Sequence, residues 1–271
     1  LELGRQATHA DRPSAAARPQ PTDGRAWDGL REFVVRRRAL EDGNGEVCSF
    51  YLEPADGGAV PDFRPGQYLT FQLEVQDPVN GELRSVTRCY SLSDGPGKDH
   101  YRVSIKRVSA PPGRADLAPG LSSNHFHDHV QVGTKLAVRA PAGHFHLQGD
   151  ARLPIVLIGG GIGITPMLSM LEAVLGSGSA REVWLFYGVR NGSEHLMKAH
   201  LQALAERHAH FHLHVCYSQP DPADRAGIDY QHHGRVDLAL LRNTLNLARY
   251  RFYVCGPRPM METLVPALEE W

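Results

Sequence analysis

The sequence is poor in cysteine, and its four cysteines are scattered: Cys48, Cys89, Cys216 and Cys255. This spacing supplies neither a disulfide framework nor a zinc knuckle, and it favours a reducing cytoplasm as the compartment. No C-x4-C-x2-C run occurs, which excludes an iron–sulfur cluster of the plant ferredoxin type within these residues.

An excess of charge of one sign is also missing. The chain has 29 basic and 30 acidic residues, and its formal net charge is −1. Nucleic acids and acidic lipids are bound by strongly basic surfaces. We therefore expect neither as a partner.

Long hydrophobic runs are limited to residues 153–171, which contain no charged residue. The run is close to the roughly 20 residues that cross a bilayer. However, four glycines and two prolines interrupt it. A lipid-exposed helix broken in this way would strand backbone polar groups, so we expect no membrane span.

Residue patterns divide the chain into three parts. Residues 1–29 are rich in Ala, Pro and Arg, lack a signal-peptide core, and are expected to form a linker or disordered tail. Residues 30–149 hold short alternating runs, such as 67–74 and 100–107, between Gly/Pro turns. This arrangement predicts a small antiparallel β-barrel.

Residues 150–271 have a different pattern, in which apolar strands alternate with helical segments. This alternation predicts a doubly wound parallel α/β sheet, so the fold class is a two-domain one. The predicted strands are 155–158, 183–187, 211–217 and 252–255, and the predicted helices are 166–175, 194–207, 237–247 and 260–269.

Three short motifs follow one another along the chain. They are Arg88-Cys89-Tyr90-Ser91, the run Gly160-Gly161-Ile162-Gly163-Ile164-Thr165-Pro166, and Cys255-Gly256-Pro257. Together they resemble the reductase module of the ferredoxin–NADP reductase superfamily, and most closely the reductase half of flavohemoglobins. The resemblance covers about residues 27–271 and implies FAD, a nicotinamide dinucleotide and hydride transfer between them.

In the family, the Arg-x-Tyr-Ser strand lies along the flavin. By resemblance, Arg88 pairs with the pyrophosphate, Tyr90 packs on the ring and Ser91 reaches N5. These side chains have suitable chemistry, namely a guanidinium, an aromatic plate and a small donor. Ser91 is thus one of two expected catalytic residues. An ordinary strand with an exposed arginine is the alternative for the motif alone.

Further FAD contacts are implied by neighbouring matches. A Gly-x-x-Ser turn, here Gly120 and Ser123, begins a helix whose amides hold the pyrophosphate. The FMN-only branch usually lacks this turn, which favours FAD. The connection 109–119 is longer than in the family, so the resemblance does not assign the residues that contact the adenine of FAD. The other expected contacts are Tyr68, Lys106 and Asn124.

The second motif predicts a nucleotide-binding turn. Gly160, Gly161 and Gly163 let the backbone approach a pyrophosphate. We expect Thr165 to be the N-cap and Pro166 the first helical residue.

The next strand lacks the acidic residue that an ordinary dinucleotide-binding fold carries for the ribose. It ends instead with Tyr187, Gly188, Val189 and Arg190, which match the Tyr-Gly-x-Arg of the reductase family.

The third motif implies the nicotinamide position. In the family this cysteine, here Cys255, lies beside the nicotinamide, and we expect it to be the second catalytic residue, acting by contact and shape. Gly256 and Pro257 shape the turn that leaves room for the ring. For an isolated cysteine at a strand end, a buried packing role is the alternative.

Histidines are abundant, with His208, His210, His212 and His214 at alternate positions. This spacing places them on one strand face and imitates a metal site. A solvated strand edge is the simpler interpretation, and we expect no bound metal.

The resemblance leads to a flavin-dependent NADH reductase that passes electrons to a heme or [2Fe–2S] centre, separate or fused. Alternatives are an electron-transfer or sensory flavoprotein without turnover, and a free-flavin or ferric reductase. Gln219 and Asp221 follow the third strand, where members that take NADPH carry basic residues. This favours NADH, although Arg225 leaves NADPH possible. Family members continue beyond the point matching Trp271, so we expect the second domain to be truncated.

Overall fold

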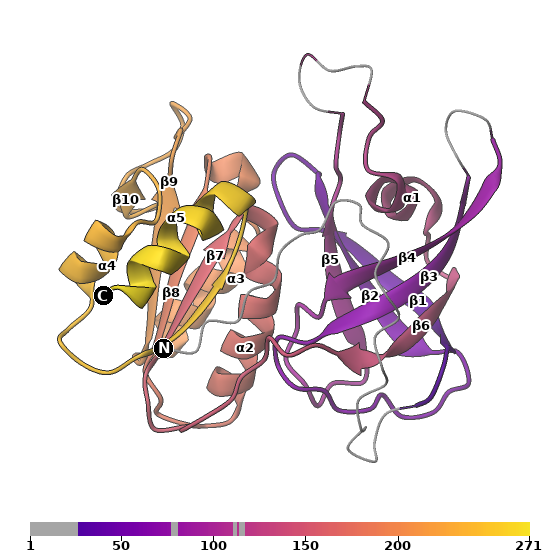
Figure 1. The fold of residues 1–271 in the computed structure, drawn as a ribbon, viewed down its shortest axis with the longest axis horizontal. Helices are drawn as coiled ribbons and strands as arrows, with labels where there is room; N and C mark the ends of the chain where they lie inside the picture. Colours follow the sequence, from indigo (N-terminus) through magenta and orange to yellow (C-terminus); the bar gives the residue numbers. More distant parts are fainter. Residues whose placement is uncertain (1–26, 77–80, 111–112, 114–116) are drawn as a thin grey trace.

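The computed structural model describes residues 27–76, 81–110, 113 and 117–271, arranged as a barrel beside a layered α/β unit (Figure 1). The predicted two-domain fold is confirmed. The segment expected to be a tail, apart from its last residues, and part of the 109–119 connection lie outside the described residues. Of that segment, Trp27 packs on the barrel, where its indole nitrogen donates to the carbonyl oxygen of Val138 at 3.1 Å.

The N-terminal unit is a six-stranded antiparallel sheet with the order β4-β3-β6-β1-β2-β5. An isolated bridge between Leu92 and Val103 connects its two ends. Phenylalanines from several strands fill the interior because alternate side chains point inward. The strands are β1 (Arg31–Leu40), β2 (Val47–Pro54), β3 (Tyr68–Gln76), β4 (Leu83–Ser91), β5 (Tyr101–Lys106) and β6 (Lys135–Ala142).

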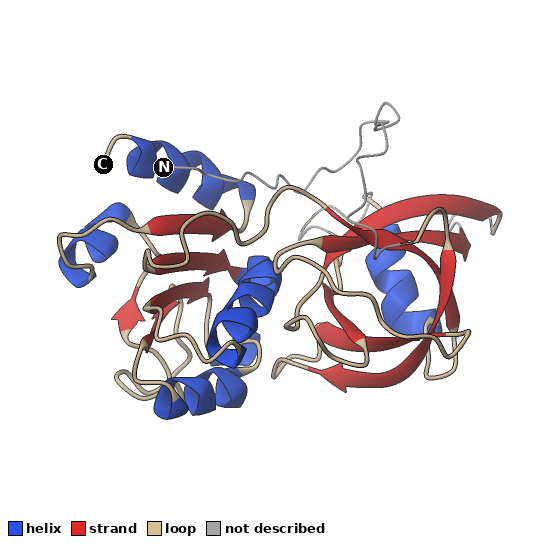
Figure 2. Ribbon diagram, turned by 90° about the horizontal axis from the view of Figure 1, so that it is seen from below, coloured by secondary structure: helices blue, strands red, loops and turns tan. Residues whose placement is uncertain are grey.

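Helix α1 (Leu121–His129) covers one end of this barrel (Figure 2). Its Phe126 is fully buried, with its ring centroid 5.3 Å from that of Phe71 and 5.2 Å from that of Tyr90. Edge-to-face contacts of this kind stabilise aromatic clusters. The helix is thereby held against β4, the strand that carries the flavin motif Arg88-Cys89-Tyr90-Ser91.

The C-terminal unit is a parallel five-stranded sheet with the order β10-β9-β8-β7-β11. The chain starts in β7 (Ile155–Gly160), moves outward through β8 (Val183–Val189), β9 (Phe211–Tyr217) and β10 (His232–His233), and returns beside β7 as β11 (Arg251–Cys255). The direction of winding therefore reverses between β7 and β11. In doubly wound sheets, ligands bind at the carboxyl ends of the strands at this reversal.

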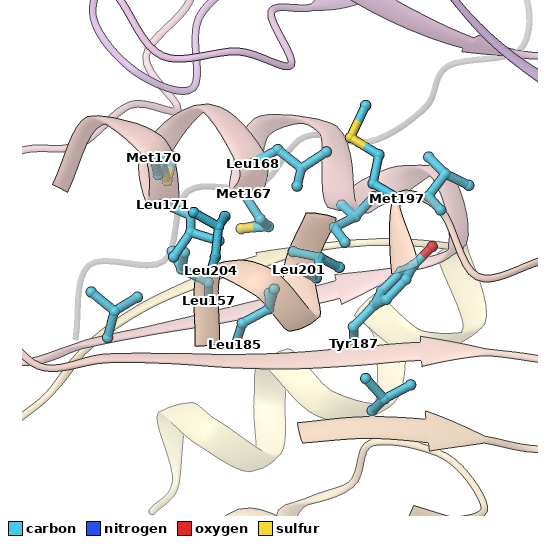
Figure 3. Packing of buried hydrophobic residues seen from close by; sticks show 14 of the residues in the cluster. Leu157, Met167, Leu168, Met170, Leu171, Leu185, Tyr187, Met197, Leu201 and Leu204 are labelled. Atoms are coloured by element: carbon cyan, nitrogen blue, oxygen red, sulfur yellow. The ribbon is translucent and has the colours of Figure 1, made fainter. Parts of the chain in front are cut away.

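Helices cover both faces of the parallel sheet (Figure 2). On one face α2 (Ile164–Gly176) and α3 (Lys198–Arg207) bury a leucine- and methionine-rich layer (Figure 3). On the other face lie α4 (Leu238–Thr244) and α5 (Arg258–Glu269). Among the described residues, no helix combines the length and the apolar character that a membrane span requires.

The predicted helix 194–207 is wrong at its beginning. Residues Gly192–Glu194 form a single 3-10 turn, Met197 has a left-handed backbone with φ of 50°, and the α-helix begins only at Lys198. The Met197 amide donates to the carbonyl oxygen of Glu41 at 2.9 Å. This hydrogen bond to the barrel holds Met197 in a non-helical conformation, so the α-helix cannot begin before it.

The histidine run also differs from expectation. His212 and His214 are half-buried, not solvated, because β9 lies between β8 and β10. The His212 ring stacks on Trp184 with centroids 4.0 Å apart, and His214 stacks on Phe186 at 4.9 Å. In the part of the chain that the structure describes, no three His, Cys, Asp or Glu side chains are grouped to hold a metal.

Candidate cofactor site

Strand β4 presents the flavin motif at the end of the sheet order. Ser91 pairs with Tyr68 on β3, and both side chains are half-buried on the same face of this strand pair. Arg88 is exposed, and its guanidinium donates to the neighbouring Thr87 carbonyl oxygen at 2.9 Å. A flexible cation is thus available beside the strand for an anionic ligand.

Tyr90 lies mostly inside the barrel end. Burial raises the pKa of its phenol, and its hydroxyl lies 2.9 Å from the hydroxyl of Ser122 on α1. The sequence did not single out Ser122. Its position between Gly120 and Ser123 was the only hint of a role in the sequence. Its hydrogen bond to Tyr90 depends on how α1 packs against β4.

Helix α1 begins at the Gly-x-x-Ser turn, as expected. The side chains of this turn, however, form hydrogen bonds within the turn itself. The Ser123 hydroxyl donates to the Gly120 carbonyl oxygen at 3.2 Å, and the Asn124 amide nitrogen donates to the same oxygen at 2.7 Å. Both residues therefore brace the turn. Lys106, also expected to contact FAD, is paired with Glu46 at 3.2 Å.

The residues around this turn fit a pyrophosphate. Helix α1 has no side chain capping its N-terminus and no acidic residue in its first turn, so its amide dipoles favour an anion. A Cβ at Gly120 would lie only 2.7 Å from the Ser123 hydroxyl oxygen, which explains the glycine. The first amides of α1 therefore have the chemistry that a pyrophosphate requires, and the exposed Arg88 is the cation that the sequence assigns to it.

The glycine turn after β7 combines tight packing with an open backbone. A Cβ at Gly160 would lie 2.6 Å from the Met260 sulfur, and one at Gly163 would collide with the Cys255 carbonyl oxygen. Gly161 has φ of +52° and no atom within 4 Å of an added Cβ. Two glycines therefore join the turn to the end of β11, and the third leaves space for a ligand.

The prediction for the start of α2 is wrong in detail. The helix begins at Ile164 with Gly163 as its N-cap, because the 3-10 turn Gly161–Gly163 leads directly into it. Thr165 lies inside the first turn, where its hydroxyl donates to the Ile162 carbonyl oxygen at 3.0 Å. Pro166 likewise lies inside the helix.

Cys255, Gly256 and Pro257 follow β11 at the reversal of the sheet. Cys255 pairs with Gly159 and is buried, and this burial raises the pKa of its thiol to about 11. The group is therefore a neutral thiol near neutrality, which suits a role in contact and shape.

The Tyr-Gly-x-Arg segment is split between core and surface. Tyr187 is fully buried among Leu and Met side chains (Figure 3), which gives it a packing role. Gly188 is half-buried, and Arg190 is exposed and paired with Glu194 at 2.7 Å. Among the three residues, only Arg190 presents a charged side chain to a ligand at the carboxyl end of β8.

The two halves of the site meet along α2 (Figure 1). The Leu92 amide donates to the Gln67 carbonyl oxygen at 2.9 Å, and the amide of the preceding residue, Gly66, donates to the Ser169 hydroxyl at 3.4 Å. Ser169 lies little more than one turn into the helix that starts at the glycine turn. The end of β4 is therefore connected across the domain interface to the helix that begins at the glycine turn.

Comparison with known families agrees with this division. A family described as "Oxidoreductase FAD-binding domain" matches residues 33–147, and one described as "Oxidoreductase NAD-binding domain" matches residues 157–265. The solved Flavohem-like FAD/NAD binding domain of nitric oxide dioxygenase from Vibrio cholerae is 30% identical, with a TM-score of 0.68. The match covers 84% of this chain and 99% of that one. The chain belongs to the ferredoxin–NADP reductase superfamily.

Other members of the superfamily carry additional domains. A flavohemoprotein of Halalkalibacterium halodurans is 39% identical over 245 residues, which are 90% of this chain and 57% of that protein. Phthalate dioxygenase reductase, described as transferring electrons from pyridine nucleotides to [2Fe–2S], is 26% identical with a TM-score of 0.66. The match covers 90% of this chain and 65% of that protein. This chain therefore spans little more than half of the flavohemoprotein, and corresponds to an FAD- and NADH-binding oxidoreductase module.

Proposed function

We propose that this reductase module takes electrons from NADH through FAD and delivers them to a heme or [2Fe–2S] centre. One observation carries the proposal, namely that the end of β4 is connected through Gln67 and Gly66 to α2, the helix that begins at the glycine turn where the parallel sheet reverses. The flavohemoprotein and the [2Fe–2S]-directed reductase support the choice of acceptors.

FAD, when bound, accepts a two-electron hydride from NADH and releases electrons singly. The chain itself supplies binding and alignment. Arg88 and the first amides of α1 would hold the flavin pyrophosphate, while the backbone around Gly161 would hold that of the dinucleotide. Ser91 would donate a hydrogen bond at the flavin ring, and the neutral Cys255 would limit how far the nicotinamide approaches.

Two further expectations belong to this proposal. All four cysteines are free thiols, which supports a reducing compartment such as the cytoplasm. We also keep the proposed domain limits, 30–149 and 150–271, because the last barrel strand ends at Ala142 and the first parallel strand begins at Ile155.

The test begins with the purified chain and its extracted cofactor. We expect noncovalent FAD, bleaching of the yellow protein by NADH without oxygen, and rapid NADH-dependent reduction of cytochrome c or ferricyanide. Extraction of FMN would contradict the cofactor assignment. A colourless protein that reduces added flavin would show a free-flavin reductase instead.

A further inference from the structure

Helix α2 belongs to the nucleotide site at its start and to the domain interface further along. Its N-terminus follows the glycine turn, whereas Ser169, Met170, Glu172 and Ala173 face the barrel. Any shift of this face relative to the barrel therefore moves the nucleotide turn relative to the flavin strand.

Glu172 is the charged centre of this interface. Its side chain is only 13% exposed, and one carboxylate oxygen lies 2.8 Å from the Lys98 ammonium of the barrel. The other oxygen lies 3.0 Å from His200 on α3 and 3.7 Å from the Arg102 guanidinium of the barrel. Burial opposes ionisation, but the hydrogen bonds from His200 and Lys98 outweigh it and hold the pKa of Glu172 well below its usual range.

The barrel side of the interface leads directly to the flavin motif. Arg102 is buried, and its guanidinium donates to both the hydroxyl and the carbonyl oxygen of Ser93. The Ser93 amide in turn donates to the Arg102 carbonyl oxygen at 2.8 Å. Ser93 stands two residues after Ser91, the last residue of β4, so Arg102 hydrogen-bonds the segment that follows β4 and forms an ion pair with the α2 carboxylate.

A second connection runs through Lys98 and the loop that follows Ser93. Lys98 forms a close ion pair with the buried Asp94 as well as with Glu172. At the next residue, a Cβ on Gly95 would lie 3.2 Å from the Glu172 Cβ and 3.5 Å from the Ala173 amide nitrogen. The loop therefore rests on the helix backbone, where only a glycine fits without displacement.

We propose that Glu172 is a positioning residue for electron transfer, because it sets the distance between the glycine turn after β7 and strand β4 through Lys98 and Arg102. The inference rests on the function proposed above. Glu172 touches neither expected cofactor position, so its effect is transmitted by the orientation of α2. No residue assignment from sequence included it.

The expected effect is large because hydride transfer depends steeply on geometry. Reacting atoms must lie about 3–3.5 Å apart, and a displacement of about 1 Å costs on the order of 100-fold in rate. Removal of the carboxylate charge also leaves the buried Arg102 guanidinium with less compensation, and it removes one of the two ion pairs of Lys98. Both effects act on the same interface.

The decisive variant is Glu172→Gln in the FAD-loaded chain, with Glu53→Gln as a matched control. Glu53 forms an exposed ion pair with Arg36 within the barrel. We expect Glu172→Gln to slow flavin reduction at saturating NADH by tenfold or more. FAD content should be unchanged and the dissociation constant for NADH should stay within about threefold.

A second readout does not use activity. Hydrogen exchange of the cofactor-free chain should become faster in the 93–98 loop and along 166–173 in Glu172→Gln, and should be unchanged in Glu53→Gln. If Glu172→Gln does not fold, Lys98→Met tests the same connection, with Lys98→Arg expected to retain the rate. Lys98 is 38% exposed, so its replacement disturbs the core less.

The outcomes separate the two proposals. A wild-type chain that binds FAD but does not oxidise NADH would contradict the proposed function. An active wild type whose Glu172→Gln variant reduces flavin at the control rate overturns only the positioning role. A slow variant whose loss matches its loss of FAD also overturns it, because the role would then be structural.

Discussion

The hydroxyl groups of Tyr90 and Ser122 lie 2.9 Å apart and connect strand β4 to the first turn of helix α1. This bond fixes the helix N-terminus beside the flavin motif. It therefore orders two parts of the proposed FAD site that are 32 residues apart in the sequence.

Tyr90→Phe should weaken FAD binding by about threefold to tenfold, because one neutral hydrogen bond contributes about 0.5–1.5 kcal/mol. Titration of the apoprotein with FAD measures the effect. Tyr250→Phe, at a half-buried tyrosine in the other unit, is the control. Equal affinities for the two variants would show that this bond does not organise the site.

Arg88→Ala should weaken FAD binding by about tenfold to 100-fold, since hydrogen bonds to charged groups contribute about 1.5–3 kcal/mol. The protein should remain as stable as before because Arg88 is exposed and bonds only a neighbouring carbonyl group among the contacts described. Arg36→Ala, another exposed arginine of the barrel, controls for lost charge. The prediction fails if both variants bind FAD alike.

Gly163→Ala should lower the free energy of unfolding by about 1–3 kcal/mol, the usual cost of overpacking. The added methyl group collides with the Cys255 carbonyl oxygen. Urea unfolding measures the loss, and Gly176→Ala is the control because its Cβ has no neighbour within 4 Å. A Gly163→Ala variant as stable as this control would contradict the close contact of the two turns.

The free energy of unfolding should depend on pH partly through the buried His195. Burial lowers its pKa to about 4, whereas an unfolded histidine has a pKa of about 6.5. The unfolded chain then binds the extra proton, so stability falls as pH drops from about 6.5 to about 4, by at most about 1.4 kcal/mol per unit.

His195→Gln should flatten this slope in urea titrations at several pH values, and exposed His233→Gln should not. Part of the slope should persist, because burial also lowers the pKa of His214 to about 4. An unchanged slope in His195→Gln would show that His195 takes up its proton without unfolding.

The dinucleotide preference should be NADH over NADPH by kcat/KM. Arg225, the nearest alternative phosphate ligand, is paired with Asp229, which also binds Lys198 at 2.7 Å. Gln219→Arg should shift the ratio towards NADPH by about tenfold, since it adds a charged phosphate donor. Gln76→Arg adds the same charge in the barrel, and an equal shift there would indicate only a general electrostatic effect.

The sequence predicted the features that depend on local pattern. Alternation located β3 and β5, and apolar runs located β7, β8, β9 and β11. Glycine-rich motifs marked the turns because their conformations need residues without Cβ atoms. In contrast, Ser122 and Glu172 function through partners 32 and 74 residues away. No local pattern reveals such partners, since the first pair depends on how α1 packs on the barrel and the second on how the two units pack together.

The two errors in helix starts have different origins. Thr165 has the side chain of a good cap, but the preceding 3-10 turn already supplies the helix start. Residues 194–197 have helical character in sequence, but the bond from Met197 to Glu41 redirects them. The first error therefore has a local cause, and in the second a tertiary contact overrides local preference.

The position of β4 at the end of the sheet order gives FAD binding a consequence for association between copies of the protein. Among the described residues, β4 pairs along its length only with β3, and a single bridge at Leu92 joins it towards β5. Open strand edges invite pairing with other chains. A flavin lying along this strand would shield that edge, so the cofactor-free chain should self-associate more readily than the FAD-loaded chain.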